Sequence, residues 1–351
     1  MNIVIDINHP AHVHYFRNFS RIMTEKGHRI YFIARNKEME HRLLDLYGFT
    51  YIGRGKGSNG RIGKFLYLLY ADYKLLRISR SVKADLFLNF LHPYPSQVAR
   101  LRGKVSLVFS DTEHASLHHR LTVPFASKVF TPACYRMDLG AKQVRFNGFM
   151  ELAYLHPRYF QPDPSVFDLL GIAAGTPYVI VRFVSWAAAH DFGHQGMSLA
   201  NKRKAIREMS AHAKVFITAE GPLPDDLEPY RMQLPVHRIH DALYYAQLLF
   251  GESATMASEA AVLGVPAIFI DNDGRGYTDE EERRYGIVFN FKESASDQER
   301  AIEKAVTLLS TPGMQEHYRG IRDRIVEECV DTTEFMVHEV MKYDQQAALT
   351  A

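Results

Sequence analysis

The amino-acid sequence predicts an α/β protein with two Rossmann-like parallel-sheet domains that face a central cleft. Three observations lead to this prediction. The chain has 351 residues, which suits two domains of about 150 to 200 residues better than one core. Short apolar runs alternate with longer helical patterns, as in βαβ units. One segment, residues 151–164, holds three prolines with little periodicity and reads as a linker between two sets of such units.

The first set of apolar runs indicates an N-terminal domain over residues 1–155. Runs such as IVIDI and VSLVFS are apolar on both faces, as expected of buried parallel strands. A helical pattern over 12–26 follows the first strand and ends at Gly27, since glycine is favoured just after a helix. The strands are expected at 2–7, 29–34, 86–90, 105–110 and 128–131.

The second set indicates a C-terminal domain over residues 165–331 that binds a nucleotide sugar. Its strands are expected at 178–184, 215–218, 247–251, 267–270 and 287–290, with helices at 201–213, 254–263 and 297–309. A last helix over 332–351 is expected to pack back on the N-terminal domain. In such sheets ligands bind at the carboxyl ends of the strands, so those ends should line the cleft.

Composition excludes several other classes of protein. Lys and Arg number 42 and Asp and Glu 40, so a net charge of +2 gives no reason to expect a nucleic-acid partner. The two cysteines have no metal-binding spacing and favour a reducing cytoplasm. The N-terminus turns polar after one short apolar run, and no run of about 18 apolar residues occurs, so neither a signal peptide nor a membrane span is expected.

Residues 248–270, LLFGESATMASEAAVLGVPAIFI, carry the strongest indication of a binding site. They read as a strand, a tight turn, a helix and a second strand. The free N–H groups and the positive end of such a helix favour a pyrophosphate, which the backbone of Ser253, Ala254 and Thr255 would bind. Glu259 lies about 9 Å further along the helix. Because helical side chains lean back toward the N-terminus, its carboxylate can accept hydrogen bonds from ribose.

This segment resembles the signature of a known superfamily. The matching residues are Glu259, Ala260, Leu263, Gly264 and Pro266, in the pattern E-A-x-x-L-G-x-P of GT-B glycosyltransferases and UDP-N-acetylglucosamine 2-epimerases. Ser253 matches the serine six residues before the glutamate, whereas Ala254 stands where the relatives usually have glycine. The resemblance implies that the serine turn binds phosphate, that Glu259 binds ribose, and that the substrate is a nucleotide diphosphate sugar, most simply a UDP-sugar.

A broader resemblance extends over most of the chain. Through the segments DINHPAHVHYFR, SDTEHA and GESATMASEAAVLGVP the sequence is similar to an uncharacterised GT-B-like family of bacteria and archaea that is linked to surface polysaccharide synthesis. This resemblance implies a GT-B fold and a role in making a cell-surface polysaccharide or glycolipid.

Three histidines follow the first strand, where an acceptor would face the cleft. His9, His12 and His14 can each take a proton near neutral pH. His12 and His14 are two residues apart and cannot share a helix face. We take His12 as the candidate base and place His9 and His14 on the acceptor side. The alternative for each is helix capping or packing, and no carboxylate or thiolate completes a metal site.

The segment SDTEHA, residues 110–115, follows another buried strand. It resembles the H-x-E-A segment of the 2-epimerases, whose glutamate takes part in catalysis. Glu113 would occupy that place, and Asp111 replaces the histidine, which argues against epimerase chemistry. The alternative is that Asp111 or the next residue caps the following helix. Together with His12, these two carboxylates are the catalytic candidates.

Two further residues are candidates for nucleotide binding. Arg182 ends the first strand of the second domain and can clamp a phosphate by two parallel bonds, or else pair with a surface acid. His240 lies in the loop before the helix that leads to Ser253. In GT-B relatives this loop supplies contacts to the base.

Residues 54–83 hold eight Lys or Arg against the single acid Asp72, interleaved with aromatic and aliphatic side chains. A helix over 61–83 either contacts an anionic membrane at its inner face or packs on the sheet with its basic side in water. The glycine-rich stretch 55–60 lacks the context of a dinucleotide-binding motif and reads as a loop near the acceptor.

The leading hypothesis is a metal-independent glycosyltransferase that moves a sugar from a nucleotide diphosphate donor to a hydroxyl of a saccharide or lipid-linked acceptor. The helix N-terminus and Arg182 would stabilise the leaving pyrophosphate in place of a metal, so no cofactor is expected. The alternatives are a sugar-nucleotide 2-epimerase and a nucleotide-sugar-binding protein without catalysis.

Overall fold

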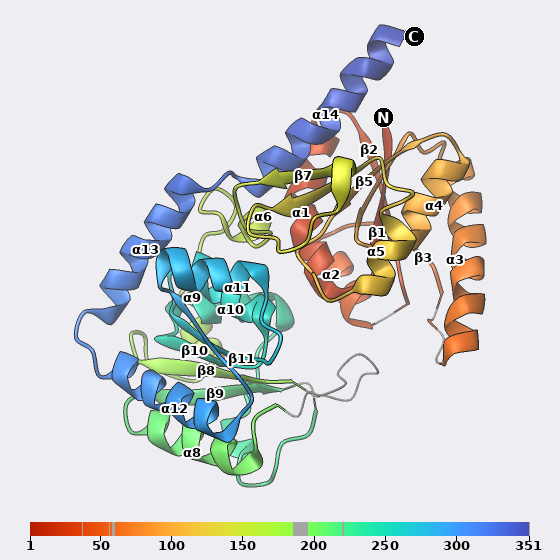
Figure 1. Cartoon of the computed structure of the whole chain (residues 1–351). Coiled ribbons are helices and arrows are strands. Elements are labelled where there is room, and N and C mark those ends of the chain that lie inside the picture. The colour runs from red at the N-terminus through yellow and green to blue at the C-terminus, as the bar shows by residue number, and fades with distance from the viewer. Residues whose placement is uncertain (37, 56, 58–59, 185–195, 220, 351) are drawn as a thin grey trace. The chain divides into compact units, whose positions relative to one another are not determined.

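The computed structural model divides into two units (Figure 1). Unit 1 comprises Met1–Tyr154 and Val330–Ala351, and unit 2 comprises Leu155–Cys329. The structure describes residues 1–36, 38–55, 57, 60–184, 196–219 and 221–350.

Unit 1 is built on a parallel sheet whose strand order is β3-β2-β1-β4-β5-β6-β7. The strands are β1 (Asn2–Ile7), β2 (Arg29–Ala34), β3 (Tyr51–Gly53), β4 (Leu86–Phe90), β5 (Val105–Phe109), β6 (Lys128–Pro132) and β7 (Gln143–Phe146). The order reverses between β1 and β4, which pair in parallel with Asp6 opposite Asn89. Ligands of doubly wound sheets bind outside the carboxyl ends of the strands at such a switch point.

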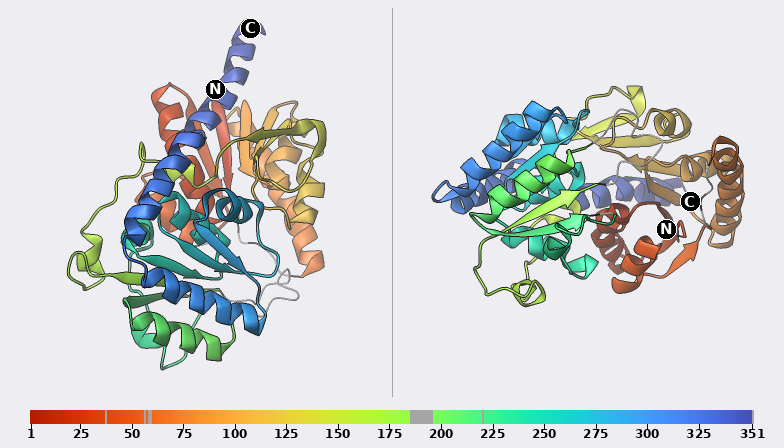
Figure 2. Two further views of the ribbon diagram at one scale, coloured as in Figure 1. Left: turned by 60° about the vertical axis from the view of Figure 1, so that its left-hand side comes forward. Right: turned by 90° about the horizontal axis from the view of Figure 1, so that it is seen from below.

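Helices cover both faces of this sheet. They are α1 (Pro10–Glu25), α2 (Glu38–Leu46), α3 (Arg61–Ser81), α4 (Pro93–Leu101), α5 (Ser116–Thr122), α6 (Leu152–Leu155) and α14 (Thr332–Thr350), with a 3-10 turn at Gly140–Lys142. The C-terminal α14 returns from unit 2 and packs along α1 (Figures 1 and 2). The hydroxyls of Thr332 and Thr333 donate to the carbonyls of Phe149 and Ala153 and so fasten the start of α14.

Unit 2 is built on a second parallel sheet, of order β12-β11-β10-β8-β9. Its strands are β8 (Tyr178–Phe183), β9 (Lys214–Ala219), β10 (Leu248–Gly251), β11 (Ala267–Ile270) and β12 (Val288–Phe291). Its helices are α7 (Val166–Leu169), α8 (Leu199–Ser210), α9 (Ile239–Tyr245), α10 (Ala254–Val262), α11 (Gly276–Glu280), α12 (Ala295–Leu309) and α13 (Met314–Glu328). Single turns occur at Glu228–Tyr230, Val236–Arg238 and, as a π-helix, Glu281–Tyr285.

The helices of unit 2 lie in two layers, one on each side of the sheet (Figure 1). Helices α8 and α12 pack together on one face, and α10 packs with α9 and α13 on the other. The order of this sheet reverses between β8 and β10, which pair with Arg182 opposite Gly251. This is the switch point of unit 2.

The strands expected from the apolar runs are present, with ends that differ by a residue or two. Two short edge strands, β3 and β7, were not predicted, because three or four residues of mixed polarity give no clear pattern. The expected linker over 151–164 is partly wrong. It begins with α6, and the Ala153 carbonyl accepts a bond from Asn18 as well as from Thr333, so its first residues belong to unit 1.

Gly27 lies just beyond α1 with φ of +87°, a conformation that favours glycine, as the helix pattern predicted. No helix among the described residues is both long and apolar enough to cross a membrane.

Candidate functional site

The turn after β10 lies at the switch point of unit 2. The Ser253 hydroxyl accepts a bond from the Met256 N–H at 3.4 Å and caps α10. Strand β10 approaches β8 so closely that a Cβ on Gly251 would overlap the Arg182 carbonyl. Arg182 therefore stands beside the turn, and its Nη1 donates to Thr218 Oγ1 at 3.2 Å. The backbone of Ala254 and Thr255 forms the first turn of α10, where the helix presents its positive end.

His240 and Glu259, which the sequence analysis treated separately, are in direct contact. His240 Nε2 lies 2.9 Å from Glu259 Oε1, and the two residues are 3% and 6% exposed. The contact joins the first turn of α9 to the middle of α10. It fixes the orientation of the carboxylate that the sequence resemblance assigns to ribose.

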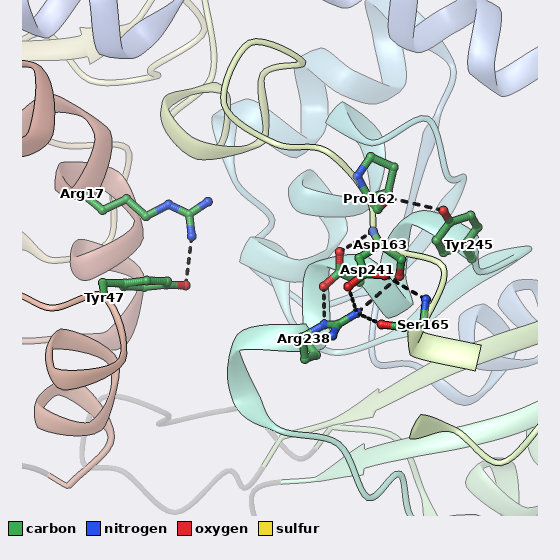
Figure 3. Close-up of polar contacts among 8 residues, drawn as sticks. All are labelled: Arg17, Tyr47, Pro162, Asp163, Ser165, Arg238, Asp241 and Tyr245. Carbon is green, nitrogen blue, oxygen red and sulfur yellow. Dashed lines mark hydrogen bonds and ion pairs between the residues drawn. The ribbon is translucent and has the colours of Figure 1, made fainter. Parts of the chain in front are cut away.

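A cluster of polar contacts that includes Arg238 and Asp241 fixes the start of α9 (Figure 3). Arg238 Nε donates to Asp241 Oδ2 at 2.7 Å, and Arg238 Nη2 lies 3.0 Å from both Asp163 Oδ2 and Ser165 Oγ. Asp241 Oδ1 accepts from the Asp163 N–H at 2.9 Å. Hydrogen bonds from the Ser165 N–H and hydroxyl, together with the Arg238 charge, lower the pKa of Asp163. The segment that enters unit 2 is thus tied to the helix that carries His240.

Glu252, between the strand and the Ser253 cap, was missed by the sequence analysis. It is 3% exposed, and its oxygens accept from the Val184 N–H at 2.9 Å and the Met197 N–H at 2.6 Å. Lys202 Nζ lies 3.7 Å away. Glu252 therefore contacts Val184 and Met197, residues far from it in the chain, and no local motif reveals such contacts. Ser185, Trp186, His190 and Asp191, which follow Arg182 in the sequence, lie outside the described residues.

Two contacts attach α10 and the residue after it to neighbouring helical segments of unit 2. Ser258 Oγ donates to Glu281 Oε1 at 2.5 Å, and complete burial raises the pKa of Glu281 to about 8. At the other end of the helix, Gly264 has φ of +76°, and a Cβ there would lie 2.9 Å from Arg322 Cβ on α13. The glycine of the E-A-x-x-L-G-x-P pattern thus has a packing role, whereas its glutamate lies against His240.

The switch point of unit 1 holds a ring of four polar residues, of which Asp6, Arg54 and His92 are buried. Asp6 Oδ1 lies 3.4 Å from Arg54 Nε, and Asp6 Oδ2 lies 3.2 Å from His92 Nδ1. Arg54 Nη2 donates to Asn8 Oδ1 at 3.3 Å, and Asn8 Nδ2 lies 3.0 Å from His92 Nε2. Because the Asn8 amide donates to Nε2, the proton of neutral His92 lies on Nδ1 and faces Asp6. Burial lowers the pKa of His92, against the effect of Asp6, and keeps the imidazole neutral.

His12 belongs to this switch point. It is 7% exposed, and its ring centroid lies 5.3 Å from that of His92, 5.0 Å from Phe90 and 5.8 Å from His9. His9 is the N-cap of α1, and its Nδ1 accepts from the Ala11 N–H at 3.2 Å. His9 therefore caps the helix, as one alternative proposed. The ring of His12 instead packs against the rings of His9 and His92.

His14 lies on a different side of α1, as its spacing from His12 predicted. Its Nδ1 is 3.3 Å from the Tyr47 hydroxyl, and its ring stacks on Tyr154 with centroids 5.3 Å apart. Tyr47 also accepts from Arg17 Nη1 at 2.9 Å (Figure 3). His14 is thus in a packing environment away from His92.

Sequence reasoning missed Asp6, Arg54 and His92. One signal could have found His92: His-Pro follows a buried strand twice, at residues 9–10 and 92–93, and each proline begins a helix. The repeat marks two adjacent strand ends. Asp6 and Arg54 carry no comparable local pattern.

The segment after β5 contains the two candidate carboxylates. Asp111 is 6% exposed and accepts from its neighbour Thr112 at 3.0 Å, whereas Glu113 is half-buried and accepts from the Arg136 N–H at 3.3 Å. The capping alternative for Asp111 and Thr112 is wrong, because α5 begins at Ser116 with Ala115 as its N-cap and without a side-chain cap.

His114 lies before the start of α5, whereas His118 lies within α5 and its ring centroid is 6.4 Å from that of His92. Among the residues described, no group of three or more His, Cys, Asp or Glu side chains could hold a metal ion.

Comparison with solved structures assigns the fold. The UDP-N-acetylglucosamine 2-epimerase of Neisseria meningitidis, solved with UDP-GlcNAc, matches with a TM-score of 0.71 at 12% identity, over 97% of this chain and 100% of that one. The spinosyn rhamnosyltransferase SpnG, solved with thymidine diphosphate, matches at 0.63 and 13% identity, over 97% and 100%. The spinosyn forosaminyltransferase SpnP matches at 0.64 and 13%, over 97% and 99%. The protein thus has the GT-B fold of glycosyltransferases and 2-epimerases.

The chain belongs to the family described as "Protein of unknown function (DUF354)", whose model matches residues 1–343. Uncharacterized protein MJ0665 of Methanocaldococcus jannaschii is 23% identical over 284 residues, which are 76% of this chain and 81% of that protein. The resemblance to an uncharacterised GT-B-like family is therefore confirmed, together with the fold class of two parallel-sheet α/β domains.

Proposed function

We propose that this protein is a glycosyltransferase that moves a sugar from a nucleotide diphosphate donor to a hydroxyl acceptor. The observation that carries the proposal is the arrangement at the switch point of unit 2. There the capped N-terminus of α10, the adjacent Arg182 and the oriented Glu259 occur together. Solved proteins of the same fold include one with UDP-GlcNAc and one with thymidine diphosphate, which supports a nucleotide-sugar ligand.

In this proposal the donor binds to unit 2. The backbone of Ser253, Ala254 and Thr255 binds the pyrophosphate at the positive end of α10, and Arg182 adds a charge that stabilises it as it leaves. Glu259 accepts hydrogen bonds from ribose, and His240 orients its carboxylate. No cofactor takes part, and the nucleotide diphosphate sugar, most simply a UDP-sugar, is a substrate.

The acceptor chemistry belongs to unit 1. A base takes the proton of the acceptor hydroxyl, the oxygen bonds to the anomeric carbon, and the nucleotide diphosphate leaves with the bonding electrons. His12 is the proposed base, because it lies at the β1–β4 switch point beside His92. Glu113 is the second candidate and Asp111 a supporting one, because both follow the carboxyl end of β5.

A second candidate function is 2-epimerisation of a UDP-sugar. The fold match to the 2-epimerase of Neisseria meningitidis and the position of Glu113 after β5 favour it. The decisive experiment incubates the protein with a UDP-sugar, with and without saccharide and lipid-linked acceptors. Transfer requires an acceptor and releases UDP, whereas epimerisation yields a new UDP-sugar alone. Nucleotide binding with no product under any condition would support a binding protein without catalysis.

We also propose that unit 1 contacts the inner face of a membrane through α3 and that the protein works in the cytoplasm. Leu66, Leu69, Tyr70 and Tyr73 form an exposed stripe on α3, and Arg77 and Arg80 continue it. Such a stripe suits an anionic bilayer and a lipid-linked acceptor of polysaccharide or glycolipid synthesis. Co-sedimentation with phosphatidylglycerol vesicles should fall in Leu66→Ser/Leu69→Ser. The control is Leu117→Ser, an exposed leucine on α5.

A further inference from the structure

Arg54 is a fully buried arginine at the carboxyl end of β3, with 0% of its surface exposed. Its guanidinium lies 4.3 Å from the centroid of the Tyr94 ring, and its Nη2 and Nε face Asn8 and Asp6. Its Nη1 atom has no hydrogen-bond partner among the described residues. A buried cationic donor without a partner is costly, because the group has left water without full replacement of its hydrogen bonds.

A second arginine reaches the same edge of the sheet from the neighbouring strand. Arg35 directly follows β2, and its guanidinium lies so close to Gly57 that a Cβ there would overlap it. Its Nε atom is buried and also lacks a hydrogen-bond partner within the described part of the chain. The charges of Arg35 and Arg54 both act on Tyr94 and His92, so the two cations belong to one cluster.

Among the described side chains named here, positive charge exceeds negative charge. The two arginines are permanently charged, Asp6 is the carboxylate in contact with Arg54, and His92 is held neutral by burial. Asp72 on α3 is another acid near Arg54, and burial raises its pKa to about 7, so it carries only part of a charge at neutral pH. One further negative group would balance the cluster.

We propose that the carboxyl ends of β2 and β3 form an anion subsite, in which Arg35 binds a phosphate or carboxylate of the acceptor and Arg54 adds its charge from the interior. Arg35 is half-exposed, whereas Arg54 is fully buried, so Arg35 is the arginine of this pair that solvent reaches. A guanidinium binds either anion through two parallel N–H bonds. The inference rests on the proposed function in taking the ligand of unit 1 to be the acceptor. The inference also restricts the acceptor to an anionic one. The anion is either the phosphate of a lipid-linked saccharide or the carboxylate of an acidic sugar.

The test is calorimetric titration of the full-length protein with inorganic pyrophosphate and, separately, with glucuronate. Saturating UDP is present to occupy unit 2. Wild type should bind one of the two anions, and Arg35→Gln should weaken that binding about tenfold or more, in line with loss of charged hydrogen bonds. Arg42→Gln, an exposed arginine on α2, is the matched control and should bind as wild type does.

Gly57→Ala provides a second variant that keeps every charge. Its methyl group should displace the Arg35 guanidinium and weaken anion binding in the same direction. Preference for pyrophosphate would assign a phosphorylated acceptor, and preference for glucuronate an acidic sugar. Absence of binding to either anion, or equal binding in wild type and Arg35→Gln, would overturn the proposal. Failure of UDP to bind would instead count against the proposed function, and the comparison of wild type with Arg35→Gln would still test the anion subsite in unit 1.

Discussion

The Nε2 atom of His240 lies 2.9 Å from the Oε1 atom of Glu259, and both side chains are almost fully buried. This contact joins two helices whose residues are 19 positions apart in the chain. The carboxylate of Glu259, which we propose binds ribose, is therefore oriented before any nucleotide arrives. Less rotamer entropy of this side chain is then lost on binding.

Replacement of Glu259 by alanine should weaken nucleotide diphosphate binding by about 1.5 to 3 kcal/mol, the range for hydrogen bonds to a charged group. The measurement is isothermal titration with UDP on folded protein. Glu299→Ala, an exposed glutamate on α12, is the control and should leave affinity unchanged. An unchanged affinity in Glu259→Ala would remove the residue from the nucleotide site.

His240 should act through Glu259. His240→Ala should reduce UDP affinity by less than Glu259→Ala does, because it frees the carboxylate to rotate but leaves it in place. In the double variant the His240 substitution should add little further loss, since residues in contact are not additive. Fully additive losses in this double-mutant cycle would indicate that His240 contacts the nucleotide independently.

His12→Ala should lower turnover by roughly 100-fold or more, the scale of a lost general base, while UDP affinity barely changes. His14→Gln is the matched control, because His14 lies two residues away but faces Tyr47 and Tyr154. If His12→Ala lost nucleotide binding but kept its rate at saturation, His12 would belong to the donor site. If neither quantity moved, Glu113→Gln would become the variant of interest.

Activity should persist in excess chelator. The positive end of α10 and Arg182 are proposed to stabilise the leaving pyrophosphate, which is the role that a divalent cation has in other enzymes. The measurement is turnover with EDTA against turnover with added magnesium or manganese. Complete loss that either metal restores would show that the leaving group needs a cation.

Glu281 should make stability fall with rising pH. Burial raises its pKa in the folded protein to about 8, above the ordinary value of 4.5 in an unfolded chain. Between these values the folded state holds a proton that the unfolded state has lost, so the stabilisation present below pH 4.5 is lost as pH rises through 8. The slope from this one group is at most about 1.4 kcal/mol per pH unit.

Urea unfolding at several pH values between 5 and 8.5 measures this effect. Glu281→Gln mimics the protonated carboxyl and keeps an oxygen for Ser258, so its stability should change less with pH than that of wild type. Parallel pH profiles for the two proteins would contradict the assignment.

The sequence by itself determined the two α/β units and the candidate turn of unit 2. Strand and helix patterns depend on neighbours a few residues apart, which is why β1, β10 and α10 could be located from apolar runs, glycines and caps. The Ser253–Glu259 segment could be found for the same reason, because its strand, turn and helix are contiguous. Helical periodicity also separated His12 from His14.

Only the tertiary structure decided which polar groups meet. Asp6, Arg54 and His92 come from three separate strand ends and gather because the sheet order places β1 between β2 and β4, with β3 at the edge. The contact between His240 and Glu259 likewise depends on how α9 packs against α10. Buried polar contacts of this kind are set by strand order, register and helix packing, and a local sequence pattern carries no record of them.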